Sequence, residues 1–292
     1  MKNPVFIGSG VALATPFTDN GVNLPVYRKL IDFVINGHTD ALITCGTTGE
    51  PSTMTDEERA SVIACAVEQS DGRVPVIVGV GTNDTKKVLA NAKQAAALGA
   101  DALLIVTPYY NKATQKGLLM HYNLIADSTD LPVIIYNVPS RTGLSISPET
   151  LERLSHHPNI VGLKESSHDI ERMTRLAMIP NLDLYSGDDD VVVPFLALGA
   201  KGVISVVANI YPAIMHEIVA DWMSSNIEQS REKQLRIYPL VKALFSEVNP
   251  IPIKTALREL GFDMGPLRLP LCEMEDQNAA QLRAVMKDLA LL

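Results

Sequence analysis

Short apolar runs rich in β-branched residues recur along the chain, separated by longer segments of mixed polarity. The runs are continuously apolar rather than alternating, which is typical of strands that are buried on both faces, as in a parallel sheet. We therefore expect eight buried strands, at Gly10–Ala14, Ala41–Thr44, Val74–Val80, Ala102–Val106, Val133–Tyr136, Ile160–Leu163, Leu182–Tyr185 and Val203–Val207.

Helical patterns with capping residues lie between these runs. Thr55 is followed three residues later by Glu58, the spacing of a capping box. Ser147-Pro148 combines an N-cap residue with the residue favoured at the first helical position. The patterns predict helices over Leu24–Asn36, Thr55–Ser70, Thr85–Leu98, Gly117–Ser128, Pro148–Ser155, Ile170–Met178 and Asp190–Leu198.

This alternation of strands and helices predicts an α/β protein with parallel strands and right-handed crossovers. Eight strands favour a closed (β/α)8 TIM barrel. A doubly wound open sheet is the alternative, but the nearest match to its phosphate-binding turn, Gly79–Asp84, has Asp84 where the third glycine belongs. We expect the barrel over residues 1–212 and a C-terminal helical extension over 213–292. Helices are predicted there at Ala213–Asn226, Ile227–Glu247, Ile253–Leu260 and Asp276–Leu291.

Composition and charge narrow the class of protein. The 292 residues include 25 Lys and Arg against 33 Asp and Glu, which gives a net charge of −8. An acidic balance argues against a nucleic-acid partner or a membrane-surface module. The longest apolar run, Val191–Ala200, is about half as long as a transmembrane helix needs. Cys45, Cys65 and Cys272 fit neither a disulfide framework nor a zinc pattern, so we expect a cytoplasmic protein.

Polar segments follow the predicted strands at their carboxyl ends, where (β/α)8 barrels carry their reactive residues. Because these ends meet at one rim, the segments should lie close together. They are Cys45–Glu50, Thr107–Asn111, Tyr136–Gly143, Lys164–Ser167, Ser186–Asp190 and Gly202–Val206.

Lys164 directly follows the apolar run Ile160–Leu163, so its side chain should start inside the barrel mouth. Burial disfavours the charged form of a lysine, and a neutral amine attacks a carbonyl to form a Schiff base. The alternative is a lysine at the end of a strand that points to solvent or pairs with Glu165.

Hydroxyl groups and one arginine accompany Lys164 at the rim. Tyr136 and Tyr110 could transfer protons with Thr47 as a relay, or simply pack as aromatic side chains. Thr48, within Thr47-Thr48-Gly49, could hold a small carboxylate or belong to a plain turn. Arg141 could grip a second carboxylate, or form a surface salt bridge.

Asp188, Asp189 and Asp190 raise the question of a metal site. Asp190 fits the N-cap of the next predicted helix, where carboxylates are favoured. No other ligand cluster accompanies the run, so we expect no metal, and the absence of a nucleotide motif leads us to expect no cofactor.

Three of these rim segments together resemble the dihydrodipicolinate synthase family, which belongs to the N-acetylneuraminate lyase-like class I aldolases. They are Gly46–Glu50, Tyr136–Gly143 and Gly162–Glu165. The resemblance runs from Ala14-Thr15-Pro16-Phe17 to Asn249–Lys254, and Pro139–Thr142 with Tyr109–Asn111 are its more discriminating parts.

The resemblance implies a function and roles for the residues. It implies a lyase of lysine and diaminopimelate biosynthesis that condenses pyruvate with L-aspartate 4-semialdehyde to give 4-hydroxy-tetrahydrodipicolinate. Lys164 would form the Schiff base, Tyr136 would exchange the proton, and Thr47 with Tyr110 would complete a relay. The resemblance also implies a homotetramer, a dimer of dimers, in which Tyr110 reaches in from a neighbouring subunit.

Binding roles and regulation also come from the resemblance. Thr48 would hold the pyruvate carboxylate, the backbone at Ile204 would line the pyruvate pocket, and Arg141 would bind the carboxylate of the aldehyde. Members inhibited by lysine carry a glutamate at the position of Lys87 and histidines at those of Asp56 and Arg59. We therefore expect lysine inhibition to be weak or absent, because Lys87 would repel the ammonium group of the ligand.

Two other functions are compatible with parts of the sequence. A sialic-acid lyase or sugar-acid aldolase would share Lys164 and Tyr136 but would not need Arg141. A non-catalytic barrel acting as a sensor would be expected to lose the lysine or the tyrosine, and both are present.

Overall fold

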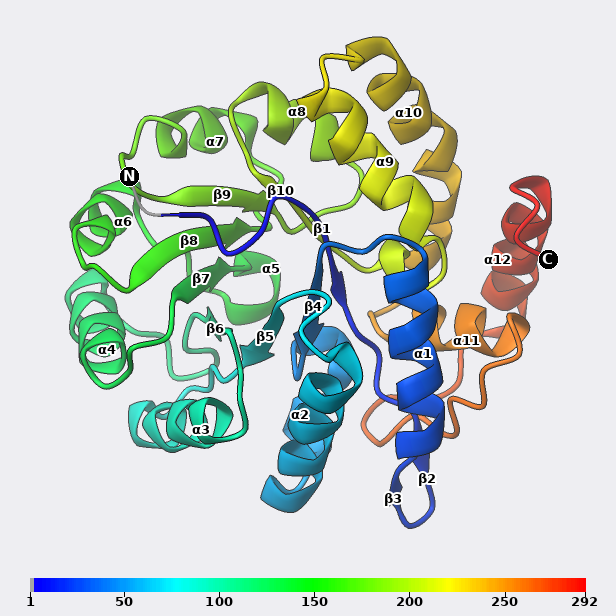
Figure 1. Ribbon diagram of the computed structural model, residues 1–292, viewed down its shortest axis with the longest axis horizontal. Coiled ribbons are helices and arrows are strands. Elements are labelled where there is room, and N and C mark those ends of the chain that lie inside the picture. The colour runs from blue at the N-terminus through cyan, green and yellow to red at the C-terminus, as the bar shows by residue number, and fades with distance from the viewer. Residues whose placement is uncertain (1–2) are drawn as a thin grey trace.

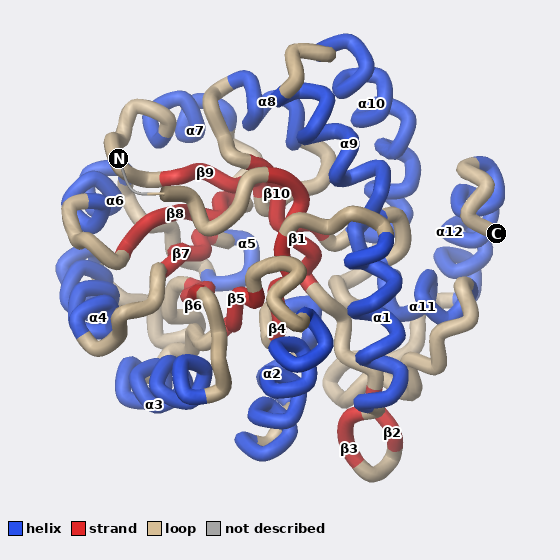
Figure 2. Tube along the Cα trace, viewed as in Figure 1, coloured by secondary structure: helices blue, strands red, loops and turns tan. Residues whose placement is uncertain are grey.

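The computed structural model describes residues 3–292 and shows a closed barrel of eight parallel strands (Figures 1 and 2). Around the barrel the order is β1, β10, β9, β8, β7, β6, β5 and β4, and β4 pairs with β1 to close the circle. The strands are β1 (Gly8–Ala12), β4 (Ala41–Thr44), β5 (Val76–Gly79), β6 (Ala102–Val106), β7 (Val133–Asn137), β8 (Ile160–Glu165), β9 (Asp183–Ser186) and β10 (Gly202–Ser205). The predicted (β/α)8 barrel is confirmed, and each of the eight predicted strands overlaps an observed one.

Helices form a ring outside the barrel in Figure 1. Alternate residues of each strand point to this ring and to the barrel interior: Leu42 belongs to the outer core and Ile43 to the inner one. Both faces are buried, which explains the continuous apolar runs. The ring comprises α1 (Leu24–Asn36), α2 (Asp56–Ser70), α3 (Thr85–Ala97), α4 (Gln115–Asp127), α6 (Pro148–Ser155), α7 (Ile170–Leu176), α8 (Val192–Ala197) and α9 (Pro212–Met223).

The helix starts follow local side-chain chemistry. In the capping box of α2, the Glu58 amide donates to Thr55 Oγ1 at 3.2 Å and the Thr55 amide donates to Glu58 Oε2 at 3.0 Å. Ser147 caps α6 by accepting from the Thr150 amide. The predicted cap at Asp190 is wrong, because α8 begins after Val191 without a side-chain cap.

The sequence pattern does not predict two short elements, each of which follows a barrel strand. A hairpin of β2 (Phe17–Thr18) and β3 (Gly21–Val22) lies between β1 and α1, and α5 (Pro139–Thr142) follows β7. Both are shorter than the window over which hydrophobic periodicity can be read.

The helices after α9 form the C-terminal part of the chain: α10 (Ile227–Leu244), α11 (Ile251–Glu259) and α12 (Asp276–Asp288). Helix α9 itself packs against β1 and α10, so it takes the place of the eighth helix of the ring (Figure 1). The division of the chain at residue 212 stays a prediction. No helix within residues 3–292 is long and apolar enough to cross a membrane.

The seam between the first and last strands is closed by the parallel pairing of β1 with β10, and one buried side chain reinforces it. Asn209 Nδ2 donates to the Ala12 carbonyl at 2.8 Å, and Asn209 Oδ1 accepts from the Ala14 amide at 3.0 Å. At the opposite end of the barrel, the stacked rings of Phe6 and Tyr185, 4.5 Å apart, fill the interior. The barrel is thus closed along its side and filled at its floor, and its open end is the end where the strands finish.

Candidate active site

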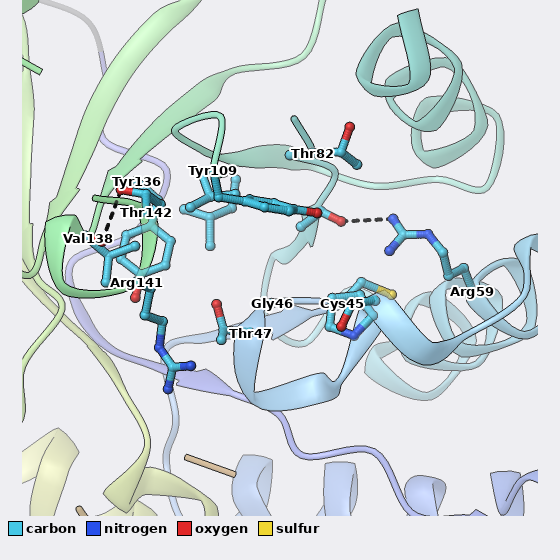
Figure 3. Close-up of a pocket in the computed structure, with 16 residues that line it drawn as sticks. Cys45, Gly46, Thr47, Arg59, Thr82, Tyr109, Tyr136, Val138, Arg141 and Thr142 are labelled. Atoms are coloured by element: carbon cyan, nitrogen blue, oxygen red, sulfur yellow. Dashed lines mark hydrogen bonds between the residues drawn. The ribbon is translucent and has the colours of Figure 1, made fainter. Parts of the chain in front are cut away.

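Two adjoining cavities open at the carboxyl ends of the strands. One, of about 170 Å³, contains Lys164, and the other, of about 250 Å³, extends toward Arg59. Figure 3 shows the larger one, with Arg59 at one end and Arg141 at the other. The two cavities share Gly46, Thr47, Leu104, Tyr136, Val138 and Arg141. The predicted rim residues Thr47, Tyr136 and Arg141 therefore do converge, and Lys164 and Thr48 join them in the smaller cavity.

Lys164 and Tyr136 are direct neighbours on adjacent strands. They face each other in the register of β7 and β8, and Lys164 Nζ lies 4.3 Å from the centre of the Tyr136 ring. Lys164 is only 6% exposed. The next residue, Glu165, points to the other face of β8, where it pairs with Arg172 at 3.1 Å and accepts from Asn137 Nδ2 at 2.8 Å. The side chain of Lys164 thus lines the cavity, while the Glu165 carboxylate is engaged elsewhere.

Gly187, at the end of β9, leaves room for the stem of the lysine. A Cβ atom built on Gly187 would lie 2.9 Å from Lys164 Cε and 1.9 Å from Ser166 Oγ. A real Cβ essentially never approaches other atoms so closely, so any side chain at position 187 would displace Lys164 or Ser166.

The turn that carries Thr47 and Thr48 is held from the C-terminal part of the chain. Thr48 Oγ1 accepts from Asn249 Nδ2 at 3.0 Å, and Arg141 Nη2 donates to the Asn249 carbonyl at 3.1 Å. Glu50 at the end of the turn is 4% exposed and accepts from Lys254 Nζ at 2.9 Å. One residue, Asn249, therefore contacts both side chains predicted to bind carboxylates.

Sequence reasoning gave Asn249 and Lys254 no role in the site. An asparagine in a loop carries no periodic signal. Lys254 does carry one, because it lies among Ile251, Ile253 and Leu257 in a predicted helix, and it is fully buried in the structure. A charged residue on the apolar face of a predicted helix could have been recognised as the partner of a buried acid.

The three aspartates after β9 have three different environments. Asp189 is buried and accepts from the Val206 and Val207 amides at 3.0 and 3.2 Å. Asp190 lies 3.4 Å from His168 Nε2. Asp188 lines the cavity that holds Lys164. Burial raises the pKa of Asp188 to about 7, while the charges of His168 and Lys164 act in the opposite direction.

Tyr110 and Ile204 do not line either cavity of the single chain. Tyr110 has a positive φ of 70° and is 92% exposed, so its side chain is hardly covered by the rest of this chain. Ile204 is fully buried in the inner core of the barrel, and Val206 lines the cavity two residues later.

Of the residues predicted to decide lysine binding, Arg59 lines the larger cavity, and Lys87 and Asp56 do not. Lys87 Nζ contacts both carboxylate oxygens of Asp56 at 2.7 Å, so its charge is compensated. Arg59 is buried, lines the cavity and donates to the Gly79 carbonyl at 3.0 Å. The expectation that Lys87 repels a ligand thus needs refinement, because the Lys87–Asp56 pair presents both charges together.

Comparison with known proteins identifies the family. The model of the dihydrodipicolinate synthetase family matches residues 5–289. The chain belongs to this family. The 4-hydroxy-tetrahydrodipicolinate synthase of Thermoanaerobacter sp. (strain X514) is 52% identical over 99% of this chain and 98% of its own length. The enzyme of the same name from Acetivibrio thermocellus is 51% identical, with both chains fully covered.

Solved structures of the dihydrodipicolinate synthetase family agree with the fold. The dihydrodipicolinate synthase of Thermotoga maritima superposes with a TM-score of 0.97 at 43% identity, covering 99% of this chain and 100% of that one. Such agreement over the full length means that the barrel and its C-terminal helices are features of the family.

Proposed function

We propose that this protein condenses pyruvate with L-aspartate 4-semialdehyde to give 4-hydroxy-tetrahydrodipicolinate, a step of diaminopimelate and lysine biosynthesis. The observation that carries the proposal is the buried Lys164, whose Nζ lies 4.3 Å from the ring centre of Tyr136 in a cavity with Thr48 and Arg141 on its walls. The names of relatives about 50% identical over the whole chain support it.

The first half of the reaction needs an amine, an acid–base group and an anchor for a carboxylate. Lys164 attacks the keto carbon of pyruvate and water leaves, which forms the Schiff base. Tyr136, beside Nζ, exchanges the proton that converts the imine to the enamine. Thr48 holds the pyruvate carboxylate, and Thr47, which lines the same cavity, relays the proton.

The second half needs a place for another charged substrate. Arg141 lines the opening common to both cavities, and its guanidinium donates to Asn249 through one nitrogen only. Its remaining donors suit the carboxylate of aspartate 4-semialdehyde. The enamine attacks the aldehyde carbon, and the amino group of the substrate then displaces Lys164 as the ring closes.

We also propose that the protein is a cytoplasmic homotetramer, a dimer of dimers, that completes its proton relay between subunits. Tyr110 is 92% exposed beside a predominantly buried rim, so its ring is available to a second copy of the chain. In that arrangement the Tyr110 hydroxyl of a neighbour meets Thr47. The free thiols of Cys45, Cys65 and Cys272 suit a reducing compartment.

Trapping with borohydride tests the covalent chemistry. Borohydride added with pyruvate should inactivate the protein and leave one reduced adduct, which peptide mapping places on Lys164. Lys164→Arg keeps the charge and should lose both the adduct and the turnover of aspartate 4-semialdehyde. An adduct on another lysine, or full activity of Lys164→Arg, would rule out the assignment.

A further inference from the structure

Among the described residues that line the Lys164 cavity, Asp188 alone carries a carboxylate. The Asp188 side chain is 13% exposed, and His168 Nδ1 lies 3.3 Å from Asp188 Oδ2. This oxygen is buried and accepts no hydrogen bond. Apart from this contact with His168, the oxygen has no partner in the chain, so the cavity contains a carboxylate that can still pair with a cationic group of a ligand.

The two acids that follow Asp188 do not share this position. Asp189 holds the amides of Val206 and Val207, and Asp190 contacts the other ring nitrogen of His168. Neither of them lines the cavity. The three consecutive aspartates are therefore not one acidic cluster, because only Asp188 faces the reacting lysine.

A buried carboxylate also has an unusual affinity for protons. Burial raises the pKa of Asp188 to about 7, so the group gains and loses a proton close to neutral pH. A base in this range accepts a proton from a substrate efficiently and returns it to water. The charged or titratable groups around Asp188 are His168, Lys164, Asp189 and Asp190, and Arg141 lines the same cavity.

The second substrate supplies a cationic donor for Asp188, and this step rests on the proposed function. Aspartate 4-semialdehyde carries a carboxylate, which Arg141 receives, and an ammonium group on the same carbon. An ammonium ion that leaves bulk water for this cavity is stabilised by an anion beside it. We propose that Asp188 binds the ammonium group of the second substrate and takes one of its protons before the ring closes.

The proton balance of ring closure shows why a base is required. An ammonium group has no lone pair, so it must lose one proton, to Asp188, before its nitrogen can attack the imine carbon. That attack forms the new C–N bond and moves the imine electron pair to the nitrogen of Lys164. The two remaining protons pass to Lys164, its bond to carbon breaks, and it leaves as a neutral amine. The ring keeps a C=N bond, and Asp188 returns its proton to water.

Asp188→Asn and a substrate without the amino group test this assignment. The variant keeps the shape of the side chain and removes its negative charge and its basicity. With aspartate 4-semialdehyde we expect kcat/KM to fall by about 10²–10⁴, the usual contribution of a positioned base. Succinic semialdehyde lacks the ammonium group, so its condensation with pyruvate on the enzyme should change less than about threefold, a difference below 1 kcal/mol.

The mass of the trapped intermediate distinguishes a chemical role of Asp188 from a merely structural one. Because ring closure is blocked, borohydride should trap an open-chain adduct on Lys164 of Asp188→Asn, with the mass of one pyruvate plus one aldehyde. The wild-type protein should yield mainly the pyruvate adduct. Asp190→Asn is the matched control, since Asp190 contacts the same histidine but lies outside the cavity, and it should behave as wild type.

Several outcomes would overturn the assignment. An equal loss with both aldehydes would mean that Asp188 acts on Lys164 rather than on the ammonium group. If Asp188→Asn has a higher KM but no open-chain adduct is trapped, Asp188 does not take the proton. If Asp188→Asn has a normal rate, Asp188 neither binds the ammonium group nor takes its proton. Failure of the wild-type protein to form any pyruvate adduct would instead contradict the proposed function, so the two hypotheses fail separately.

Discussion

Replacing Glu50 with Gln tests how strongly the C-terminal part of the chain holds the turn that carries Thr47 and Thr48. The Glu50 carboxylate accepts from Lys254 Nζ at 2.9 Å, and both side chains are at most 2% exposed. In Glu50→Gln the Lys254 ammonium group would keep its hydrogen bond to the Pro266 carbonyl at 3.2 Å and its contact with the face of the Phe17 ring. It would lose the carboxylate with which it pairs.

The magnitude follows from the burial of Lys254. Removing one partner of a buried ion pair leaves an uncompensated charge and costs about 3–5 kcal/mol. For a chain of this size, 1 kcal/mol corresponds to about 2–4 °C in Tm, so we expect Tm to fall by roughly 6–20 °C. Burial already lowers the pKa of Lys254, and without Glu50 the neutral form is favoured further. The loss should therefore shrink as the pH rises toward about 10.4, the pKa of a lysine in the unfolded chain.

Urea unfolding at a fixed protein concentration measures the effect, with a matched surface pair as control. Glu68→Gln removes the same charge from an ion pair with Arg28 that has a similar distance, 2.7 Å, but is 40% and 64% exposed. Such exposed pairs contribute about 0–1 kcal/mol. Adding Lys254→Met to Glu50→Gln should recover part of the stability, because the unpaired charge is then gone. Equal losses in Glu50→Gln and Glu68→Gln would refute the reasoning.

Three other expectations follow from the site. Asp188→Asn should be more stable than wild type at pH 8 by up to about 4 kcal/mol and equal to it near pH 4. The pKa of Asp188 is raised to about 7 in the folded chain against about 3.9 in the unfolded chain, so the wild-type protein loses stability as the pH rises from 4 through 7. Urea unfolding of both proteins at pH 4 and pH 8 measures the difference. The same difference in stability at both pH values would contradict the expectation. Arg141→Ala removes a contact worth about 1.5–3 kcal/mol, so the KM for the aldehyde should rise roughly 10- to 100-fold in steady-state assays while trapping of pyruvate stays near wild type. L-lysine at about 1 mM should leave activity unchanged, because the Lys87–Asp56 pair offers no free carboxylate for its ammonium group; Lys87→Glu should restore binding detectable by calorimetry, and inhibition of the wild-type protein well below 1 mM would argue against this.

The sequence pattern predicts the barrel well because its strands are buried on both faces and most helices of the ring begin with a capping side chain. Tyr136 and Lys164 could be placed together for the same reason, since the ends of parallel strands meet at one rim. The register that puts them opposite each other is a property of β7 and β8 as a pair, and no single strand specifies it.

Other parts of the site depend on contacts between distant segments. Asn249 reaches back to Thr48 across 201 positions of the chain, and Lys254 reaches Glu50 across 204. Local propensity and periodicity contain no information on such pairs. The three consecutive aspartates after β9 show the same limit of the sequence pattern. They look alike in the sequence, but the folded structure places each of them in a different environment.

The closure of the barrel at Asn209 has a consequence for how the site forms during synthesis of the chain. The cavity that holds Lys164 is lined by residues from Ala12 in β1 to Asn249 before α11, and β1 finds its partner β10 only near the end of the barrel. A nascent chain that has emerged through Lys164 already contains both Lys164 and Tyr136, yet it lacks the strand that closes the wall and the asparagine that holds Thr48. The Lys164 amine is thus left without its enclosure until synthesis has passed residue 249, and the site is complete only when the two ends of the barrel have met.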